Sequence, residues 1–183
     1  MQVIETPFEG LLEIIPNVYQ DSRGWFYESF KETTFRAAGI NYQFVQENQS
    51  FSRKGVIRGL HFQREPHAQA KLASVLMGKV LDVVVDLRPA SRTFGKFYTC
   101  VLDGVRRNML MVPDGFAHGF SALEDSLFFY KCSNFYHKES ESGIIWNDPQ
   151  LAIDWQVENP IVSEKDQLLP TLDELLRKSV ISP

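Results

Sequence analysis

The stretch Ala73-Ser-Val-Leu-Met77-Gly78-Lys79-Val80-Leu-Asp-Val-Val-Val-Asp86-Leu87 decides the fold class of this chain. It contains two short apolar runs, Ala73–Met77 and Val80–Leu87, in which valine is the commonest residue type. Short runs rich in β-branched residues favour strands over helices. Because Gly78-Lys79 between the runs suits a tight turn, we expect two successive strands joined by a hairpin.

Similar apolar runs separated by turn residues occupy most of the chain on both sides of this stretch. They predict further strands at Leu11–Ile15, Trp25–Phe30, Tyr42–Gln49, Val56–Phe62, Gly95–Leu102, Asn108–Val112 and Ser126–Phe135. Helices are expected only at Lys31–Ala38, which Gly39 would terminate, and at Asp173–Lys178 near the C-terminus. Many short strands without helical crossovers indicate an antiparallel sandwich or barrel, in one domain covering residues 1–183.

Composition excludes several classes of partner. The 183 residues carry a formal charge of -4, with 19 basic and 23 acidic side chains. A protein that binds nucleic acid or a membrane surface normally has a basic patch, so neither partner is expected. The N-terminus does not resemble a signal peptide, and no apolar stretch approaches the roughly 20 residues needed to span a bilayer. Cys100 and Cys132 form no metal-type or disulfide framework, so a cytoplasmic location is expected.

His61 is the first candidate for chemistry, in the run Arg58-Gly-Leu-His-Phe-Gln63. Because side chains alternate along a strand, His61 should share a face with Gly59 and Gln63. Arg58 should then lie on the opposite face, unless a bulge or bend near Gly59 redirects it. The residues alone leave two interpretations open, a hydrogen-bonded structural histidine and a general base.

Other polar side chains are equally open to two interpretations. His118 lies between glycines after Pro113, which predicts a tight loop in which the ring either bonds backbone or contacts a ligand. Lys71, at a strand entrance, is either solvated or functional, and Tyr130 should face away from Phe129. Asp166 either pairs with a histidine or caps a helix.

A catalytic metal is not expected. The His-x-His pair followed by Glu or Gln that would supply several ligands from one hairpin is absent from the sequence. His61 and His67 are separated by five residues across an apparent turn, and His137 lies in a polar region. Neither the number nor the spacing of these residues matches a well-specified metal site.

A series of motifs follows in order along about residues 3–170, and together they are far more specific than any one of them. They are Asp21-x-Arg23-Gly24, Phe44-Val-Gln46-x-Asn48, Arg58-Gly-Leu-His-Phe-Gln63, Gln69-x-Lys71-Leu72, Asp82-Val-x-Val-Asp86-Leu-Arg88, Phe94-Gly95, Pro113-x-Gly115-Phe-Ala-His-Gly-Phe120, Tyr130-Lys131, Trp146-Asn-Asp-Pro149 and Ser163-Glu-Lys-Asp166. This series resembles the dTDP-4-dehydrorhamnose 3,5-epimerase family. The resemblance implies an all-β, cupin-type jelly-roll barrel with a few short peripheral helices, working without metal or other cofactor.

The resemblance also implies a role for each matching residue. His61 would be the base and Asp166 its orienting partner, with Tyr130 as the acid on the opposite face and Lys71 near the ketone-derived oxygen. Family members are homodimers that exchange N-terminal strands, here about residues 1–30, while residues 163–183 would form a helical tail. The substrate-binding residues would be Arg23, Phe26 and Glu28 from the partner subunit for the nucleotide, and Gln46, Asn48, Arg58 and His118 for the sugar and diphosphate.

The implied reaction inverts C3 and C5 of dTDP-4-dehydro-6-deoxy-D-glucose to give dTDP-4-dehydro-L-rhamnose. Protons beside a ketone are acidic because the carbanion delocalises as an enolate, so the reaction needs a base, a charge near the oxygen and a second proton donor. Ala70 and Ser74 stand where the family usually has glycine and often has arginine, and both flank Lys71. Alternatives are a C3-only or C5-only epimerase of another 4-keto sugar nucleotide, a non-catalytic sugar-binding cupin and a metal-dependent cupin oxygenase.

Overall fold

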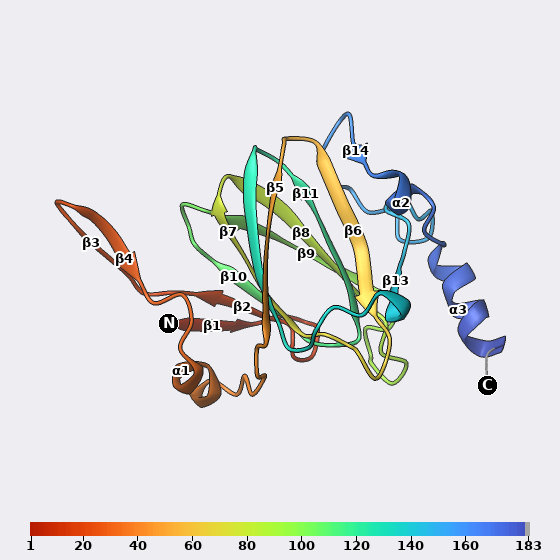
Figure 1. Cartoon of the computed structure of the whole chain (residues 1–183), viewed down its shortest axis with the longest axis horizontal. Coiled ribbons are helices and arrows are strands. Elements are labelled where there is room, and N and C mark those ends of the chain that lie inside the picture. The colour runs from red at the N-terminus through yellow and green to blue at the C-terminus, as the bar shows by residue number, and fades with distance from the viewer. Residues whose placement is uncertain (182–183) are drawn as a thin grey trace.

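Two antiparallel β-sheets face each other in a computed structural model that describes residues 1–181 (Figure 1). The first sheet has the strand order β1 (Gln2–Glu5), β2 (Leu12–Ile15), β10 (Met109–Val112), β7 (Lys71–Met77), β12 (Ser126–Cys132) and β5 (Gln46–Ser52). The second has the order β13 (Glu141–Gly143), β6 (Val56–Gln63), β11 (Phe116–Ala122), β8 (Lys79–Asp86) and β9 (Phe97–Asp103), with β14 (Ile161–Val162) parallel to β6. The all-β jelly-roll fold class is confirmed.

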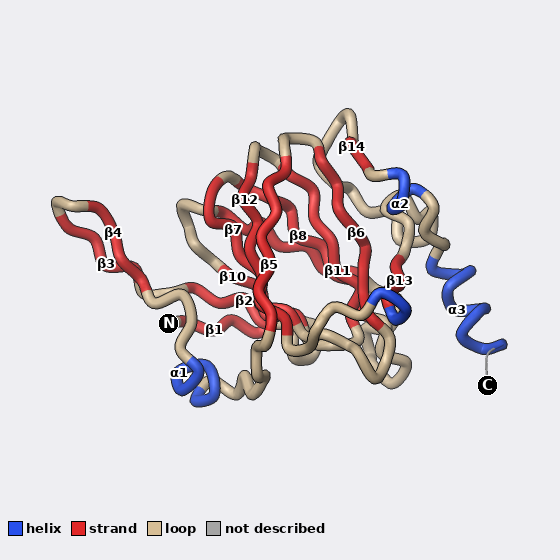
Figure 2. Tube along the Cα trace, viewed as in Figure 1, coloured by secondary structure: helices blue, strands red, loops and turns tan. Residues whose placement is uncertain are grey.

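Helices are short and lie at the periphery (Figure 2). They are α1 (Glu32–Ala37), the 3-10 helix η1 (Lys138–Ser140), α2 (Glu164–Gln167) and α3 (Leu172–Ile181). The predicted helix before Gly39 is confirmed, and Gly39 has the positive φ of 83° that a helix-terminating glycine supplies. None of the helices in residues 1–181 is both long and apolar enough to cross a bilayer.

A separate two-stranded hairpin extends away from both sheets (Figure 1). It consists of β3 (Val18–Asp21) and β4 (Gly24–Tyr27), which pair with each other and with no other strand of residues 1–181. The strands β1 and β2, which precede it, belong to the first sheet of the same chain. The hairpin is therefore the part of residues 1–30 that extends beyond the two sheets, with the Trp25 ring stacked against the guanidinium of Arg107.

Strand β8, which lies between β11 and β9, is buried on both faces, which explains why its sequence lacks the usual alternation of apolar and polar residues. Val80 and Val84 point into the core between the sheets, together with Phe128 of β12. Leu81 and Val83 face outward, where the C-terminal segment covers them with Trp155, Leu172 and Leu175. The C-terminal tail therefore completes a second apolar layer.

The hairpin expected at Gly78-Lys79 is wrong. Strand β7 pairs with β10 and β12 in the first sheet, whereas β8 pairs with β9 and β11 in the second. Gly78 has a φ of 80°, and any side chain there would collide with the carbonyl oxygen of Asp125. The glycine thus makes a corner at which the chain passes from one sheet to the other, and local sequence cannot distinguish this corner from a hairpin turn.

The loop expected around His118 is also wrong, because His118 lies within β11. The turn is confined to the residues just before Phe116, and the strand starts there. Gly119 also lies in this strand. Glycine is required at this position because a Cβ would lie 2.5 Å from the carbonyl oxygen of Arg58 in β6. Here glycine marks a close approach of two strands rather than a loop.

We expect Gly78→Ala to lower the free energy of unfolding by about 2–4 kcal/mol, because alanine adds both the strain of a positive φ and a collision with Asp125. Gly39→Ala is the matched control, since Gly39 has a φ of 83° and a Cβ added there would meet nothing within 4 Å. It should cost only about 1 kcal/mol. Chemical denaturation measures both values, and equal losses would contradict the role of the Gly78 corner.

Candidate active site

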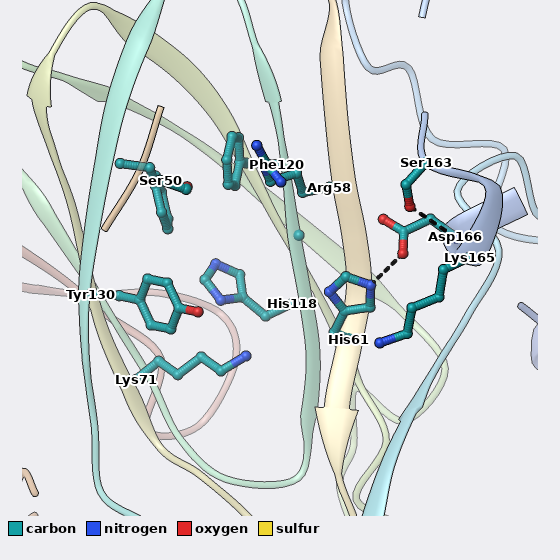
Figure 3. A pocket seen from close by; sticks show the side chains of 12 residues that line it. Ser50, Arg58, His61, Lys71, His118, Phe120, Tyr130, Ser163, Lys165 and Asp166 are labelled. Carbon is teal, nitrogen blue, oxygen red and sulfur yellow. Dashed lines mark hydrogen bonds and ion pairs between the residues drawn. The ribbon is translucent and has the colours of Figure 1, made fainter. Parts of the chain in front are cut away.

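A cavity of ≈ 310 Å³ opens between the two sheets and receives polar side chains from both of them (Figure 3). The second sheet supplies residues from β6 and β11, the first sheet supplies residues from β5, β7 and β12, and the α2 region closes one side. The lining residues are Ser50, Arg58, His61, Lys71, His118, Gly119, Phe120, Phe128, Tyr130, Ser163, Lys165 and Asp166.

His61 and Asp166 form a hydrogen-bonded pair on one wall, with His61 Nε2 2.8 Å from Asp166 Oδ1. The carboxylate is buried, and its other oxygen accepts the backbone N–H of Gly59 at 3.1 Å. Burial opposes ionisation of Asp166, but the hydrogen bonds from His61, Gly59 and Ser163 outweigh it and lower the pKa of Asp166. Because Asp166 occupies Nε2, Nδ1 is the ring nitrogen that can accept a proton from a molecule in the cavity.

Of the two roles open to Asp166, pairing with a histidine is the one it takes. The cap of α2 is Ser163, whose hydroxyl accepts the backbone N–H of Asp166 at 3.1 Å. This cap fixes the first turn of the helix, and with it the direction of the Asp166 side chain.

Arg58 reaches the same cavity as His61 because the strand bends between them. Gly59 has a φ of 119°, and the pairing of β6 with β11 shifts register between His118 and Phe120. From the alternation of side chains alone, Arg58 would lie on the face opposite His61, and this bend near Gly59 brings it to the same side. Its guanidinium donates to Ser52 Oγ at 3.0 Å and to the carbonyl oxygen of Phe51 at 3.1 Å. Both acceptors are neutral, so the positive charge remains available to an anion.

Tyr130 and Lys71 form the wall opposite His61 (Figure 3). Tyr130 points inward while Phe129 lies on the outer face of the sheet, as the alternation predicted. Burial raises the pKa of Tyr130, so its phenol is protonated at neutral pH. Lys71 is half-buried, with Nζ 5.8 Å from the centre of the Tyr130 ring, and desolvation lowers the pKa of its ammonium.

A second histidine–carboxylate pair lies deeper in the barrel. His118 Nε2 is 2.8 Å from Asp82 Oδ1, and both side chains are buried. Burial raises the pKa of Asp82, although the contact with His118 acts in the opposite direction. Sequence reasoning missed Asp82 as a partner. The sequence did contain a signal for this residue, because Asp82 is an acidic residue on the same face of β8 as Val80 and Val84, where apolar core residues are expected.

Gln46 and Asn48 lie beside the cavity on β5, where Asn48 is the cross-strand neighbour of Tyr130. Gln46 Nε2 donates to Asn48 Oδ1 at 3.2 Å. The residue of β5 that lines the cavity is Ser50, two positions further on the same face. The other lining residues that sequence reasoning missed are Gly119, Phe120, Phe128, Ser163 and Lys165, although all except Phe128 fall inside the ordered motifs.

Besides Gln46 and Asn48, three further predicted binding residues do not line this cavity. Arg23 and Phe26 lie on the β3–β4 hairpin and Glu28 directly follows it, at a distance from the barrel (Figure 1). Arg23 forms an exposed ion pair with Asp21 at 2.6 Å, and Phe26 is 69% exposed. Within one chain, these residues cannot meet His61.

No group of three or more His, Cys, Asp or Glu side chains in residues 1–181 is arranged to hold a metal ion. The two remaining histidines stack on each other outside the cavity, with the ring centres of His67 and His137 3.7 Å apart. The cavity residues are suited to moving protons and binding an anion.

The model of one protein family, described as dTDP-4-dehydrorhamnose 3,5-epimerase, matches residues 5–174. The dTDP-4-dehydrorhamnose 3,5-epimerase of Escherichia coli (strain K12) is 49% identical, and the alignment covers 100% of both chains. Among solved structures, dTDP-6-deoxy-D-glucose-3,5-epimerase RmlC from Legionella pneumophila, in complex with dTDP-4-keto-L-rhamnose, is 46% identical. Its TM-score is 0.90, and the match covers 94% of this chain and 93% of that one.

A more distant solved structure has a narrower activity. ChmJ from Streptomyces bikiniensis, a 3'-monoepimerase in complex with dTDP-quinovose, is 33% identical with a TM-score of 0.89, over 96% of this chain and 90% of that one. Both structures have the same fold as the two sheets described above. From the family model and from relatives nearly half identical over the full length, the chain belongs to the dTDP-4-dehydrorhamnose 3,5-epimerase family.

Proposed function

We propose that this protein inverts C3 and C5 of dTDP-4-dehydro-6-deoxy-D-glucose to give dTDP-4-dehydro-L-rhamnose. The observation that carries the proposal is the placement of a base and an acid on opposite walls of one cavity, with the His61–Asp166 pair on one side and Tyr130 on the other (Figure 3). Inversion of a carbon needs a proton removed from one face and another added to the opposite face. Binding alone would not need this pair.

His61 removes the proton next to the C4 ketone. Nδ1 takes the proton, while the ionised Asp166 at Nε2 holds the ring orientation and stabilises the imidazolium that forms. The bond electrons move from the C–H bond to the ketone oxygen, giving an enolate. The lowered pKa of Asp166 means that the stabilising charge is present throughout the neutral range.

Lys71 stabilises the negative oxygen of the enolate. Its ammonium is half-buried in a cavity wall, where the effective dielectric constant is lower than in water and a fixed charge acts more strongly. Burial removes the ammonium from water, which lowers its pKa. Burial also strengthens the attraction between the ammonium and the negative enolate. His118, hydrogen-bonded to Asp82, lies between the two walls and presents a polar edge to the sugar (Figure 3).

Tyr130 returns a proton from the other face. Its phenol is protonated because burial raises its pKa, and its O–H can protonate the carbanion-like carbon and complete the inversion. His61 then releases its proton to solvent and Tyr130 recovers one from solvent. Two such cycles, one at C3 and one at C5, convert the D-sugar to the L-sugar. Both carbons adjoin C4, so one ketone activates both.

The residues expected to bind the nucleotide end of the substrate do not line the cavity of their own chain. We propose a homodimer in which the β3–β4 hairpin reaches the partner's cavity, bringing Arg23, Phe26 and Glu28 to the nucleotide. Exposed Phe26 offers a face for the base, and Arg23 a paired N–H donor for phosphate. Support comes from the extension of the hairpin and from apolar side chains on the outer face of the first sheet, including 52% exposed Phe51 and 43% exposed Leu76.

Arg58, Gln46 and Asn48 are proposed for the diphosphate and sugar, since the charge of Arg58 is bonded only to neutral acceptors. Metal-free catalysis is part of the same proposal, because the base, acid and charge that the reaction needs are all supplied by side chains. A cytoplasmic location is proposed too, supported by Cys100 and Cys132, which are both free thiols.

A C3-only epimerase is the second candidate. The observation behind it is the likeness to a 3'-monoepimerase. Ala70 and Ser74 do not line the cavity, and Ser74 lies on the outer face of β7. The higher identity to 3,5-epimerases favours inversion at both centres.

Incubation with dTDP-4-dehydro-6-deoxy-D-glucose in deuterated water should label both C3 and C5, because each inversion exchanges its proton with solvent. NMR and mass spectrometry of the product locate the label. Label at one carbon supports the second candidate, and no exchange with the nucleotide bound overturns the proposal. His61→Ala should lower exchange by roughly 10²–10⁴-fold while nucleotide binding persists. His67→Ala, outside the cavity, is the matched control.

Tyr130→Phe should impair product formation more than proton exchange. His61 and Asp166 remain, so the first C–H bond still breaks, but the proton for the opposite face is missing. The ratio of inverted product to incorporated deuterium should fall at least about tenfold relative to the wild type. Equal losses of exchange and product would remove Tyr130 from the role of acid. Phe129→Leu, on the outer face, is the control for packing of β12.

Mixing two inactive variants tests whether the hairpin serves the partner. His61→Ala and Phe26→Ala homodimers should each have low activity at limiting substrate. If Phe26 acts in the partner's cavity, unfolding and refolding an equal mixture restores roughly a quarter of the wild-type sites, because half the dimers are mixed and each has one intact site. No recovery in mixtures that form dimers would show that Phe26 does not complement His61 across the interface.

A further inference from the structure

Strand β5 presents a row of uncharged polar side chains to the side of the first sheet that holds the cavity. Gln46 and Asn48 lie two residues apart on this face, where both are half-buried. Their cross-strand neighbours on β12 are Cys132 and Tyr130. The amide next to the proposed acid is therefore that of Asn48, and its direction decides whether Tyr130 meets a donor or an acceptor.

The direction of the Asn48 amide is fixed by a chain of hydrogen bonds that begins at the backbone. The N–H of Tyr136 donates to Gln46 Oε1 at 2.9 Å. Because a backbone N–H can only donate, Gln46 must turn its oxygen toward Tyr136, which leaves its Nε2 for Asn48. Gln46 Nε2 donates to Asn48 Oδ1 at 3.2 Å, so Asn48 must turn its Nδ2 toward β12.

Asn48 is therefore a donor to both of its neighbours on β12. Its Nδ2 donates to Cys132 Sγ at 3.7 Å. Burial raises the pKa of Tyr130, and a side-chain hydrogen bond with Asn48 acts in the opposite direction. Because the phenol oxygen accepts from Asn48, its own hydrogen must point elsewhere. Figure 3 shows the Tyr130 hydroxyl directed into the cavity, toward the wall of His61.

Asn48 is the polar group that β5 adds to the surroundings of Tyr130. Burial raises the pKa of the phenol most, and Cys132 and Glu141 act in the same direction, whereas Arg58 favours the phenolate as Asn48 does. An uncharged donor stabilises the phenolate without competing for the enolate, as a further cation would. The titratable and charged groups that face Tyr130 from β6, β7, β11, β12, β13 and α2 are Arg58, His61, Lys71, His118, Cys132, Glu141, Lys165 and Asp166.

We propose that Asn48, held in its orientation by Gln46, is a positioning residue that donates to the Tyr130 oxygen, directs the Tyr130 proton at the sugar and stabilises the phenolate. In the transfer, the O–H bond breaks, the electron pair of the enolate forms the new C–H bond, and the negative charge stays on the phenol oxygen until solvent returns a proton. The inference deepens the proposed function and rests on it for the role of Tyr130 as acid. Gln46 has a second N–H and Asn48 Oδ1 a second lone pair, which can still serve the sugar or diphosphate.

The pKa of Tyr130 measures whether Asn48 donates to it. With 3-fluorotyrosine in place of Tyr130, fluorine NMR follows the ionisation of this one phenol. Asn48→Leu removes the donor, which disfavours the phenolate and should raise the pKa by about one unit. Gln46→Glu still accepts from Tyr136 but offers Asn48 only an acceptor. The Asn48 amide then turns its oxygen toward Tyr130, and the pKa should rise by about 1.5 units.

The double variant separates the turned amide from the added charge. In the Asn48→Leu background, Gln46→Glu adds only a carboxylate, so it should raise the pKa of Tyr130 by about half a unit. Equal shifts in the two backgrounds would show that Asn48 does not carry the effect, and would overturn the proposal. Gln43→Glu, the same change at an exposed position before β5, is the matched control and should leave the titration unaltered.

The fate of the enolate tests the direction of the proton. Asn48→Leu and Gln46→Glu should each lower the ratio of inverted product to incorporated deuterium by roughly threefold to tenfold. The ratio compares two outcomes of substrate that is already bound, so weaker binding does not change it. In the Tyr130→Phe background neither change should lower it further. An unchanged ratio in the single variants, or a further fall in that background, overturns the proposal.

Two checks keep the outcomes separate. Circular dichroism shows whether each variant is folded, and Asn48→Ala replaces Asn48→Leu if the latter is not, with a pKa shift of the same direction expected. Absence of epimerisation by the wild-type protein would refute the proposed function, and the fluorine titration would still decide whether Asn48 donates to Tyr130.

Discussion

The close approach of β6 and β11 at two glycines is the constraint on which the cavity depends. A Cβ on Gly59 would lie 2.6 Å from the Cα of Gly119, so neither strand can carry a side chain at this crossing. The bend that results turns Arg58 and His61 toward the same space and frees the Gly59 N–H to donate to Asp166. A backbone contact without any side chain thereby sets the directions of His61, Asp166 and Arg58, which are proposed as the base, its orienting carboxylate and a cation for the diphosphate.

The charged side chains in and around the cavity differ in how far hydrogen bonds offset the cost of burying their charge. Asp166 and Glu141 receive enough hydrogen bonds to remain ionised despite burial, whereas Lys71 keeps its charge at a cost because desolvation opposes it. Such an arrangement favours a negative group near the wall that carries Lys71 and a protonated imidazole on the other wall. In the proposed reaction, the groups that remove and return a proton are therefore on opposite walls, with the ketone of the sugar between them.

Sequence alone predicted the elements better than their assembly. Periodicity located most strands and α1, and the ordered motifs placed His61, Lys71, Tyr130 and Asp166, which the fold brings to one cavity. It failed where two remote segments decide the outcome. Gly78 has the local signature of a hairpin but joins different sheets. The sequence around His118 predicts a loop because it cannot show that Gly119 is required by the close approach of β6. The Asp82–His118 and Glu141–Lys165 contacts likewise link strands or helices that no short window of sequence contains.

The corner at Gly78 has a consequence for how the active protein forms. Because β7 and β8 do not pair with each other, Lys71 meets Cys132 and Asp86 meets Phe116 only after long stretches of chain have been brought together. Contacts of high sequence separation form slowly, because long loops must be closed before the contacts can stabilise the fold. The two sheets that line the cavity are therefore expected to form slowly, and a mutation that weakens the fold should reduce the number of competent molecules.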